Sequence, residues 1–351
     1  MFRLLVGLSL LFAAPVGADE LPDLKRKANR KAWRTQDEPI RLGPLPARVR
    51  NPVYIVQLQP GFDRALVTPP GRMEVSFEMD WANIFDKWSR NVYGGRNRGR
   101  FDLEIIRPSA QVRIGLKGGV ELGLEIPLVA LVGGIGDPII QGWHELFGLE
   151  NGGREDVENG TFTYDIGIPF IQEHRIRRAT QMRLGDISTH VRVQVLRPTY
   201  GRLGLVLGGG LKAPTGSEAQ GTGSGAMDGY FLASAEHGLG PFAFYGQVGV
   251  TVFGRTGLLG PLLAPVAVTG GVAIELIVTP HWSIVVQLRG STPFHMGFIH
   301  PWLNRGPLGI SFGARWRIGA LDLALGTEQD LNGSDPSSDI AIVFRASITT
   351  P

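Results

Sequence analysis

The chain has 351 residues, a formal net charge of +3, no cysteine, 43% hydrophobic residues, 49 glycines and 24 prolines. The lack of cysteine excludes disulfides, thiolate metal sites, cysteine nucleophiles and lipid attachment through an N-terminal cysteine. The small net charge, from nearly balanced acidic and basic residues, gives no reason to expect a nucleic-acid partner.

Residues 1–18 have the pattern of a cleaved export signal. Arg3 supplies a positive charge, residues 4–14 are apolar, and Val16-Gly17-Ala18 offers small residues for cleavage before Asp19. The apolar stretch is shorter than the roughly 20 residues of a membrane-spanning helix. We therefore expect export with removal of this segment.

Residues 19–59 differ in composition from the rest of the chain. Proline-rich turns through Gly43-Pro44-Leu45-Pro46 follow a basic cluster of Lys25, Arg26, Lys27, Arg30, Lys31 and Arg34. A cation-rich segment is typical of a solvated element and is poorly suited to an apolar core. We expect a periplasmic arm here, with a plug folded into an acidic lumen as the alternative.

From Met73 onward, apolar and polar residues alternate with the period of two that a β-strand imposes. We expect about twelve strands, at residues 73–81, 101–116, 120–128, 187–195, 203–213, 230–237, 242–252, 266–278, 284–288, 308–316, 321–325 and 340–348. The sixth is the weakest, because neither of its faces is clearly apolar. In the second, Phe101, Leu103 and Ile105 would face outward before a change of phase, which predicts a β-bulge at Arg107-Pro108-Ser109.

The connections between these strands alternate in length. The short ones are residues 117–119, 197–202, 238–240, 279–281 and 318–320, and the long ones are 86–100, 132–183, 214–227, 254–264, 292–306 and 328–338. This alternation is typical of a bacterial outer-membrane β-barrel, with short turns and both termini in the periplasm and long loops outside.

A soluble β-sandwich would show the same strand alternation. The export signal and the unequal connections favour the membrane barrel, as do aromatic residues near strand ends, which mark membrane interfaces in barrels: Trp81, Phe85, Phe253, Trp282 and Trp316. We therefore predict an all-β, antiparallel transmembrane barrel over residues 60–351.

The inward positions of the predicted barrel carry opposite charges on two walls. The acidic wall comes from the first three strands, with Glu74, Glu78, Asp80, Glu121 and Glu125, and the basic wall from the last four, with Arg289, Arg315, Arg317 and Arg345. Closure of the barrel would bring the two walls together. Two interpretations stay open: a polar pore for small charged solutes, and an interior closed by salt bridges.

The longest loop contains one helical pattern. Asp137-Pro138 resembles a helix start and Gly148 a helix end, and the apolar stripe between them consists of Ile139, Ile140, Trp143, Leu146 and Phe147. Such a stripe needs cover, which could be the outer leaflet, the barrel mouth or a partner.

Nothing in the sequence favours an enzyme. A lipid hydrolase of the outer membrane needs a serine and a histidine placed together, and the seven histidines fall in no such frame. His295 and His300 share one outer loop, which is a weak indication of metal binding. We expect no catalytic residue, no cofactor and no metal.

The chain resembles a family of exported proteins known as the domain of unknown function numbered 3187. The resemblance rests on Pro44-Leu45-Pro46, Arg50-Asn51-Pro52, Glu78-Met79-Asp80-Trp81-Ala82-Asn83, Gly142-Trp143-His144-Glu145-Leu146-Phe147-Gly148-Leu149, Asn151-Gly152-Gly153-Arg154 and Leu184-Gly185-Asp186-Ile187. It implies an outer-membrane location for nearly the whole mature chain and says nothing of a substrate.

The leading hypothesis is an outer-membrane pore or binding channel for small polar or charged solutes. The alternatives are a closed structural or interaction barrel and, more remotely, a lipid hydrolase. The expected partners are outer-membrane lipid and small polar solutes, and the sequence does not specify an oligomeric state.

Overall fold

The computed structural model describes residues 41–46, 48–92, 95–138, 141–142, 145, 157–168, 172–199, 201–257, 259–296, 304–331 and 340–350, with backbone alone at 88–92, 95–98, 167–168 and 172–174. The predicted signal at 1–18 and the basic cluster from Lys25 to Arg34 lie outside these residues. So do all five residues of the loop stripe, Ile139, Ile140, Trp143, Leu146 and Phe147, and also His300.

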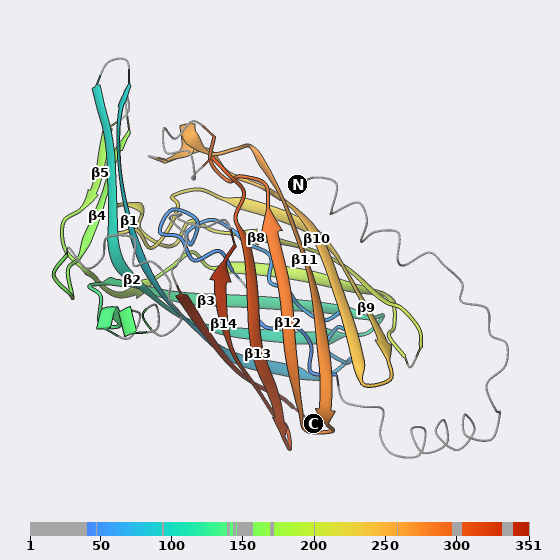
Figure 1. Cartoon of the computed structure of the whole chain (residues 1–351). Helices are drawn as coiled ribbons and strands as arrows, with labels where there is room; N and C mark the ends of the chain where they lie inside the picture. The colour runs from blue at the N-terminus through green and yellow to red at the C-terminus, as the bar shows by residue number, and fades with distance from the viewer. Residues whose placement is uncertain are drawn as a thin grey trace, which may run out of the picture. The chain divides into compact units, whose positions relative to one another are not determined.

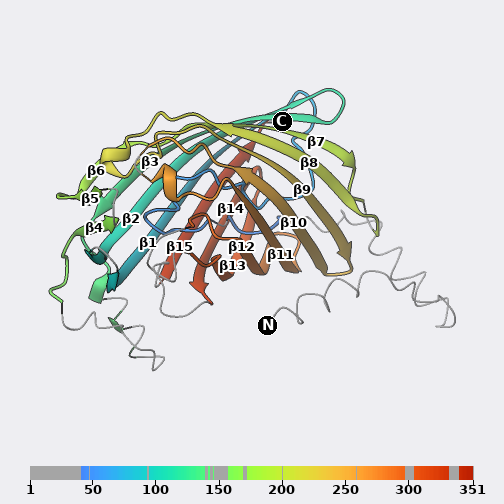
Figure 2. The ribbon, with the colours of Figure 1, turned by 90° about the horizontal axis from the view of Figure 1, so that it is seen from above.

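The predicted antiparallel barrel is confirmed, as a closed ring of 12 strands (Figures 1 and 2). Its members are β1 (Met73–Val92), β2 (Gly95–Leu116), β3 (Val120–Val132), β7 (Ser188–Leu196), β8 (Gly204–Lys212), β9 (Asp228–Leu239), β10 (Phe242–Val252), β11 (Val266–Thr279), β12 (Trp282–Ser291), β13 (Leu308–Ile318), β14 (Leu321–Asp330) and β15 (Ile340–Thr349). Each pairs with the next along the chain, and β15 closes the ring against β1, with Glu78 opposite Arg345.

The short connections follow the prediction, but the first long one does not. Residues predicted as a loop at 86–100 continue both strands, which pair as far as Val92 opposite Gly95. Figure 1 shows this hairpin of β1 and β2 rising above the ring. The register between β1 and β2 is not interrupted, so their hydrogen-bonded ladder continues beyond the ring.

The long connection between β3 and β7 forms three further strands. β4 (Thr163–Ile168) pairs with β2, β5 (Gln172–Ile176) pairs with β4, and β6 (Thr180–Leu184) pairs with β3. Two 3₁₀ turns, η2 (Glu218–Gln220) and η3 (Gly260–Leu262), lie in later long connections. No helix among the described residues is long and apolar enough to cross a membrane.

The outer face of the ring is apolar, as the alternation predicts. Val75, Phe77, Leu122, Val191 and Val248 are each between 43% and 53% exposed. Their neighbours along each strand point inward and are mostly buried, which gives the alternating burial of β9, β10 and β12. A continuous apolar belt around a closed barrel is the surface that a bilayer covers.

Two of the aromatic residues expected at the interface, Trp282 and Trp316, lie opposite each other on β12 and β13, next to short turns. Phe253 differs from the expectation. It is 4% exposed and its ring centroid lies 5.0 Å from that of Phe294, in a cluster of buried side chains.

The predicted bulge in the second strand is wrong. β2 pairs with β1 without a register shift, so Phe101, Leu103 and Ile105 share the inward face with Arg107. All three apolar side chains are at most 1% exposed and belong to a buried cluster with residues 53–56. The sequence shows an apparent change of phase because the inward side chains of β2 are apolar at residues 101–105, where they pack against residues 53–56, and polar from Arg107 onward.

Residues 41–68, here called the luminal segment, run through the interior of the ring. In Figures 1 and 2 this segment, in blue, lies between the two sides of the barrel. None of its described residues is exposed, and Leu45, Val53 and Ala65 are 0% exposed. The part of the chain expected as a periplasmic arm, as far as it is described, therefore fills the lumen.

The barrel lumen as a candidate functional site

The start of the luminal segment is fixed by backbone hydrogen bonds to the wall formed by β11 and β12. Leu42 and Gly43 donate their N–H groups to the carboxylate of Glu275 at 3.0 and 3.1 Å, and Leu45 donates to Gln287 at 2.9 Å. Glu275 also accepts hydrogen bonds from Tyr245 and Ser283 on the neighbouring strands and is 0% exposed. Four donors replace the water that this buried carboxylate gives up.

The middle of the segment supplies cations to the acidic wall. Arg48 lies 2.7 Å from Glu125 and 3.4 Å from Glu78, and Arg50 lies 2.6 Å from Asp80. These carboxylates would otherwise be buried beside one another at high cost. The arginines of the luminal segment therefore make the acidic wall compatible with a filled lumen.

The end of the segment bridges the walls that the sequence predicted to adjoin. Asp63 accepts from Arg113 of β2 at 2.9 Å and from Arg345 of β15 at 3.4 Å, and Arg345 also lies 2.9 Å from Glu74. On the other side, Arg64 pairs with Glu236 at 2.7 Å. One segment thus joins strands on opposite sides of the ring.

Toward the long loops, the segment contacts a charged cluster of one lysine and two aspartates. Lys212 lies 2.9 Å from Asp186 and 2.8 Å from Asp228, and it donates to the carbonyl of Val56 at 2.9 Å. Asp228 also accepts the N–H of Leu58 at 3.0 Å. Three buried charges therefore hold the segment to the outer end of the barrel.

A cluster of buried rings lies at the same end of the barrel. The ring of Tyr54 lies 4.8 Å from Phe294 and 5.1 Å from His295, centroid to centroid. His295 is completely buried, and this burial lowers its pKa to about 3. The imidazole is therefore neutral at physiological pH.

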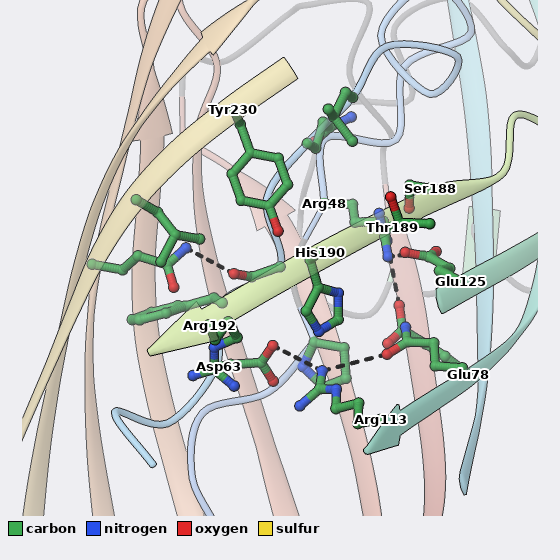
Figure 3. A pocket seen from close by; sticks show the side chains of 18 of the residues that line it. Arg48, Asp63, Glu78, Arg113, Glu125, Ser188, Thr189, His190, Arg192 and Tyr230 are labelled. Carbon is green, nitrogen blue, oxygen red and sulfur yellow. Dashed lines mark hydrogen bonds and ion pairs between the residues drawn. The ribbon is translucent and has the colours of Figure 1, made fainter. Parts of the chain in front are cut away.

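Cavities remain between the segment and the wall. One of ≈ 160 Å³ lies at the short-turn end, and one of ≈ 50 Å³ lies further in and is drawn in Figure 3. Both are lined by Asp63, Arg113, Arg192 and Arg345, so this group of charges separates them. Figure 3 shows Asp63 and Arg113 together at one side of the inner cavity, with Arg48 near Glu125 and Glu78.

The series of cavities continues toward the long loops. A third, of ≈ 30 Å³, shares Arg48, Glu125 and Ser188 with the inner cavity, and a fourth, of ≈ 10 Å³, shares Val56 and Gln57 with the third. A water molecule needs roughly 10–15 Å³ of such space. The lumen thus contains water-sized spaces from the short turns to the long loops, and neighbouring spaces share lining residues.

Each predicted lumen residue lines one of the interior cavities or contacts the luminal segment. Arg317 forms two hydrogen bonds with Asp322, at 2.5 and 2.6 Å. Arg289 lines a smaller cavity with Arg50 and Glu328. The other seven have the following positions: Glu74, Glu121, Arg315 and Arg345 at the short-turn cavity, Glu78 and Glu125 at the inner cavity, and Asp80 against Arg50.

Several residues of the lumen were not predicted. Arg107, Glu236 and Glu275 occupy inward positions, and each is a charged residue within an apolar alternation. That signal was present in the sequence. In contrast, Asp63 comes before the first strand, so no strand alternation could place it.

Comparisons with known proteins agree with this geometry. A family model described as a protein of unknown function (DUF3187) matches residues 24–347. No curated protein matches the sequence.

Solved structures resemble the chain at low sequence identity. An outer membrane channel from Pseudomonas putida F1 matches with a TM-score of 0.54 at 11% identity, over 84% of this chain and 100% of that chain. The NanC porin gives 0.44 at 7% identity, over 79% and 98%. The Pseudomonas putida toluene transporter TodX gives 0.34 at 7%, over 80% and 89%. At such identity the first of these shows the fold alone, which is that of outer-membrane β-barrels.

Proposed function

This chain belongs to the family of proteins of unknown function DUF3187, and we propose that it is an outer-membrane channel for small polar or charged solutes. In this proposal the luminal segment narrows the passage and selects what enters. An outer-membrane location is supported by the barrel fold and by the apolar belt on its outer face.

The observation that carries the proposal is the series of cavities that share lining residues from the short turns to the long loops. Charged pairs line both adjoining cavities at two of its junctions: Asp63 with Arg113 at one, and Arg48 with Glu125 at the next. A side chain can change rotamer while the backbone keeps its place, whereas a barrier of paired backbone would need local unfolding. In this proposal the passage opens at these two junctions without displacement of the whole segment.

The lining of the first three cavities is charged. Arginine and carboxylate side chains both line each of them, so a solute that crosses must exchange hydration for contacts with charged groups there. Apolar solutes gain nothing from such a lining, which favours small hydrophilic ones.

A closed structural barrel is the second candidate. It is favoured by the burial of the luminal segment and by the fixed ion pairs, such as Arg50 with Asp80, whose side chains are both 1% exposed. Ion pairs of this kind resist separation, because each lone partner would remain as a buried charge.

Planar-bilayer recording distinguishes the two candidates. We expect the folded full-length protein to give discrete conductance steps, and the Asp63→Ala variant to give larger ones, because the shorter side chain widens the point between the first two cavities. Heat-modifiable migration on gels verifies the fold of each sample. Folded protein that gives no steps in either form would reject the channel and support the closed barrel.

A further inference from the structure

The cavity at the short-turn end carries an excess of positive charge. Six arginines and four carboxylates line it: Arg64, Arg113, Arg192, Arg315, Arg317 and Arg345, with Asp63, Glu74, Glu121 and Asp322. Most of these arginines have a carboxylate partner in or beside the cavity, as Arg192 has Glu121 at 3.2 Å.

Arg315 is the exception in the described part of the chain. Its side chain is 6% exposed, yet among the described residues it makes a single hydrogen bond, to the carbonyl of Pro44 at 2.8 Å, and no carboxylate of these residues lies within 4.0 Å of it. Its Nε is buried and has no hydrogen-bond partner, as is true of the Nε atoms of Arg113 and Arg345. A buried guanidinium without a counter-ion is costly, so Arg315 is suited to bind an anion.

The nearby carboxylates form their hydrogen bonds with other donors. Glu275 already accepts hydrogen bonds from the backbone of residues 42–43 and from two side chains, and Asp322 already accepts two from Arg317. The carboxylate of Asp63 shows how an anion can be bound among these arginines. Its carboxylate lies between Arg113 and Arg345, one oxygen toward each.

We propose that this cavity binds a small oxyanion, of carboxylate or phosphate type, between Arg315 and Arg345, and that the carboxylate of Asp63 is an internal competitor for it. Planar guanidinium groups match carboxylate and phosphate oxygens geometrically, and they are the residues that most often bind such anions. A cavity of ≈ 160 Å³ has room for an ion of this size with some of its water. As a solute site, this inference rests on the proposed function, but anion binding itself is measurable without conduction.

Calorimetric titration of the folded full-length protein in detergent, with inorganic phosphate and with acetate, tests the site. We expect saturable binding by the wild type. Asp63→Asn removes the internal competitor with little change of shape, and we expect it to bind either anion roughly tenfold more tightly. Arg315→Gln removes the unpaired cation, and we expect a loss of roughly tenfold or more.

A matched control is Arg202→Gln, which removes one exposed arginine at the same end of the barrel, outside the cavity lining. Affinity in this control should stay within about twofold of the wild type. The proposal is overturned if Arg315→Gln behaves like the control, or if Asp63→Asn binds no more tightly than the wild type. The second comparison decides the matter even if Arg315→Gln does not fold.

Titration and bilayer recording together separate this inference from the proposed function. Binding with the expected order of variants but without conductance steps would reject the channel and keep the oxyanion site. Conductance steps without binding would keep the channel and reject the site.

Discussion

The guanidinium of Arg50 lies 2.6 Å from the carboxylate of Asp80, and both side chains are 1% exposed. Arg50 comes from the luminal segment and Asp80 from β1, so this pair joins the interior to the wall at the centre of the barrel. Arg107 of β2 lies 3.6 Å from the same carboxylate, and Glu328 of β14 lies 3.2 Å from Arg50. The luminal segment is therefore part of the charge balance of the barrel.

The first prediction concerns this pair. Asp80→Asn leaves Arg50 with Glu328 as its remaining counter-ion, and we expect the free energy of unfolding to fall by about 1–3 kcal/mol. Urea unfolding in detergent measures it. The control is Asp165→Asn, which breaks the 2.5 Å pair with Arg175 in the outer extension, where the arginine side chain is 40% exposed. That loss should be at most about 1 kcal/mol, and equal effects of the two variants would contradict the role given to Arg50.

The second prediction concerns the junction between the inner cavity and the third. Arg48→Gln removes the positive charge beside Glu78 and Glu125, so the electrostatic potential at this point of the passage becomes more negative. We expect the reversal potential in a KCl gradient across a planar bilayer to shift toward cation selectivity. Arg175→Gln, in the outer extension, should leave it unchanged. A reversal potential unaffected by Arg48→Gln would place the ion path elsewhere.

The third prediction concerns the contact between Leu45 and the barrel wall. Gly313 and Gly326 lie opposite each other on β13 and β14. A Cβ added to Gly313 would lie 2.3 Å from the carbonyl oxygen of Leu325 and 2.8 Å from Leu45 Cδ1. We expect Gly313→Ala to lower the free energy of unfolding by about 1–3 kcal/mol, through overpacking against the backbone.

Gly246→Ala is the control for that experiment, because its Cβ would meet no atom within 4 Å. Its effect should lie within about 0.5 kcal/mol of zero. If Gly313→Ala unfolds at the same urea concentration as this control, the luminal segment packs less tightly on β13 than the structure shows.

The fourth prediction concerns pH. Burial lowers the pKa of His295 to about 3 from the usual 6.5, so the unfolded chain binds a proton below pH 6.5 that the folded chain does not take up until about pH 3. Stability should therefore fall as the pH falls from about 6.5 to about 3, by up to roughly 1.4 kcal/mol per pH unit from this group. Urea unfolding between pH 7 and pH 4 measures the slope.

His295→Leu should make that slope shallower, whereas His281→Leu, at an exposed turn residue, should keep it. Other titrating groups contribute equally to all three proteins, so the comparison isolates the buried imidazole. An unchanged slope in His295→Leu would show that His295 is accessible to water.

The strands that resisted prediction share a physical cause with the luminal segment. In β9, Tyr230 and Leu232 point inward and pack on Leu58, which explains why neither face of the predicted sixth strand looked apolar. In β2, the inward apolar run packs on residues 53–56. An inner face that carries apolar residues needs an apolar partner inside the barrel, so both anomalies were signs of a filled lumen.

The sequence alone determined the number of strands in the ring, the outward face of most of them, the positions of the short connections, and the neighbouring acidic and basic walls. These features follow from local periodicity and from the order of the strands, which an antiparallel barrel preserves. Only the tertiary structure decided what occupies the lumen. The contacts of the luminal segment join residues more than 200 positions apart, such as Leu42 and Glu275, and no periodic pattern specifies which inward charge lies opposite an irregular chain. Arg48 and Arg50 of this segment lie inside because the acidic wall supplies their counter-ions.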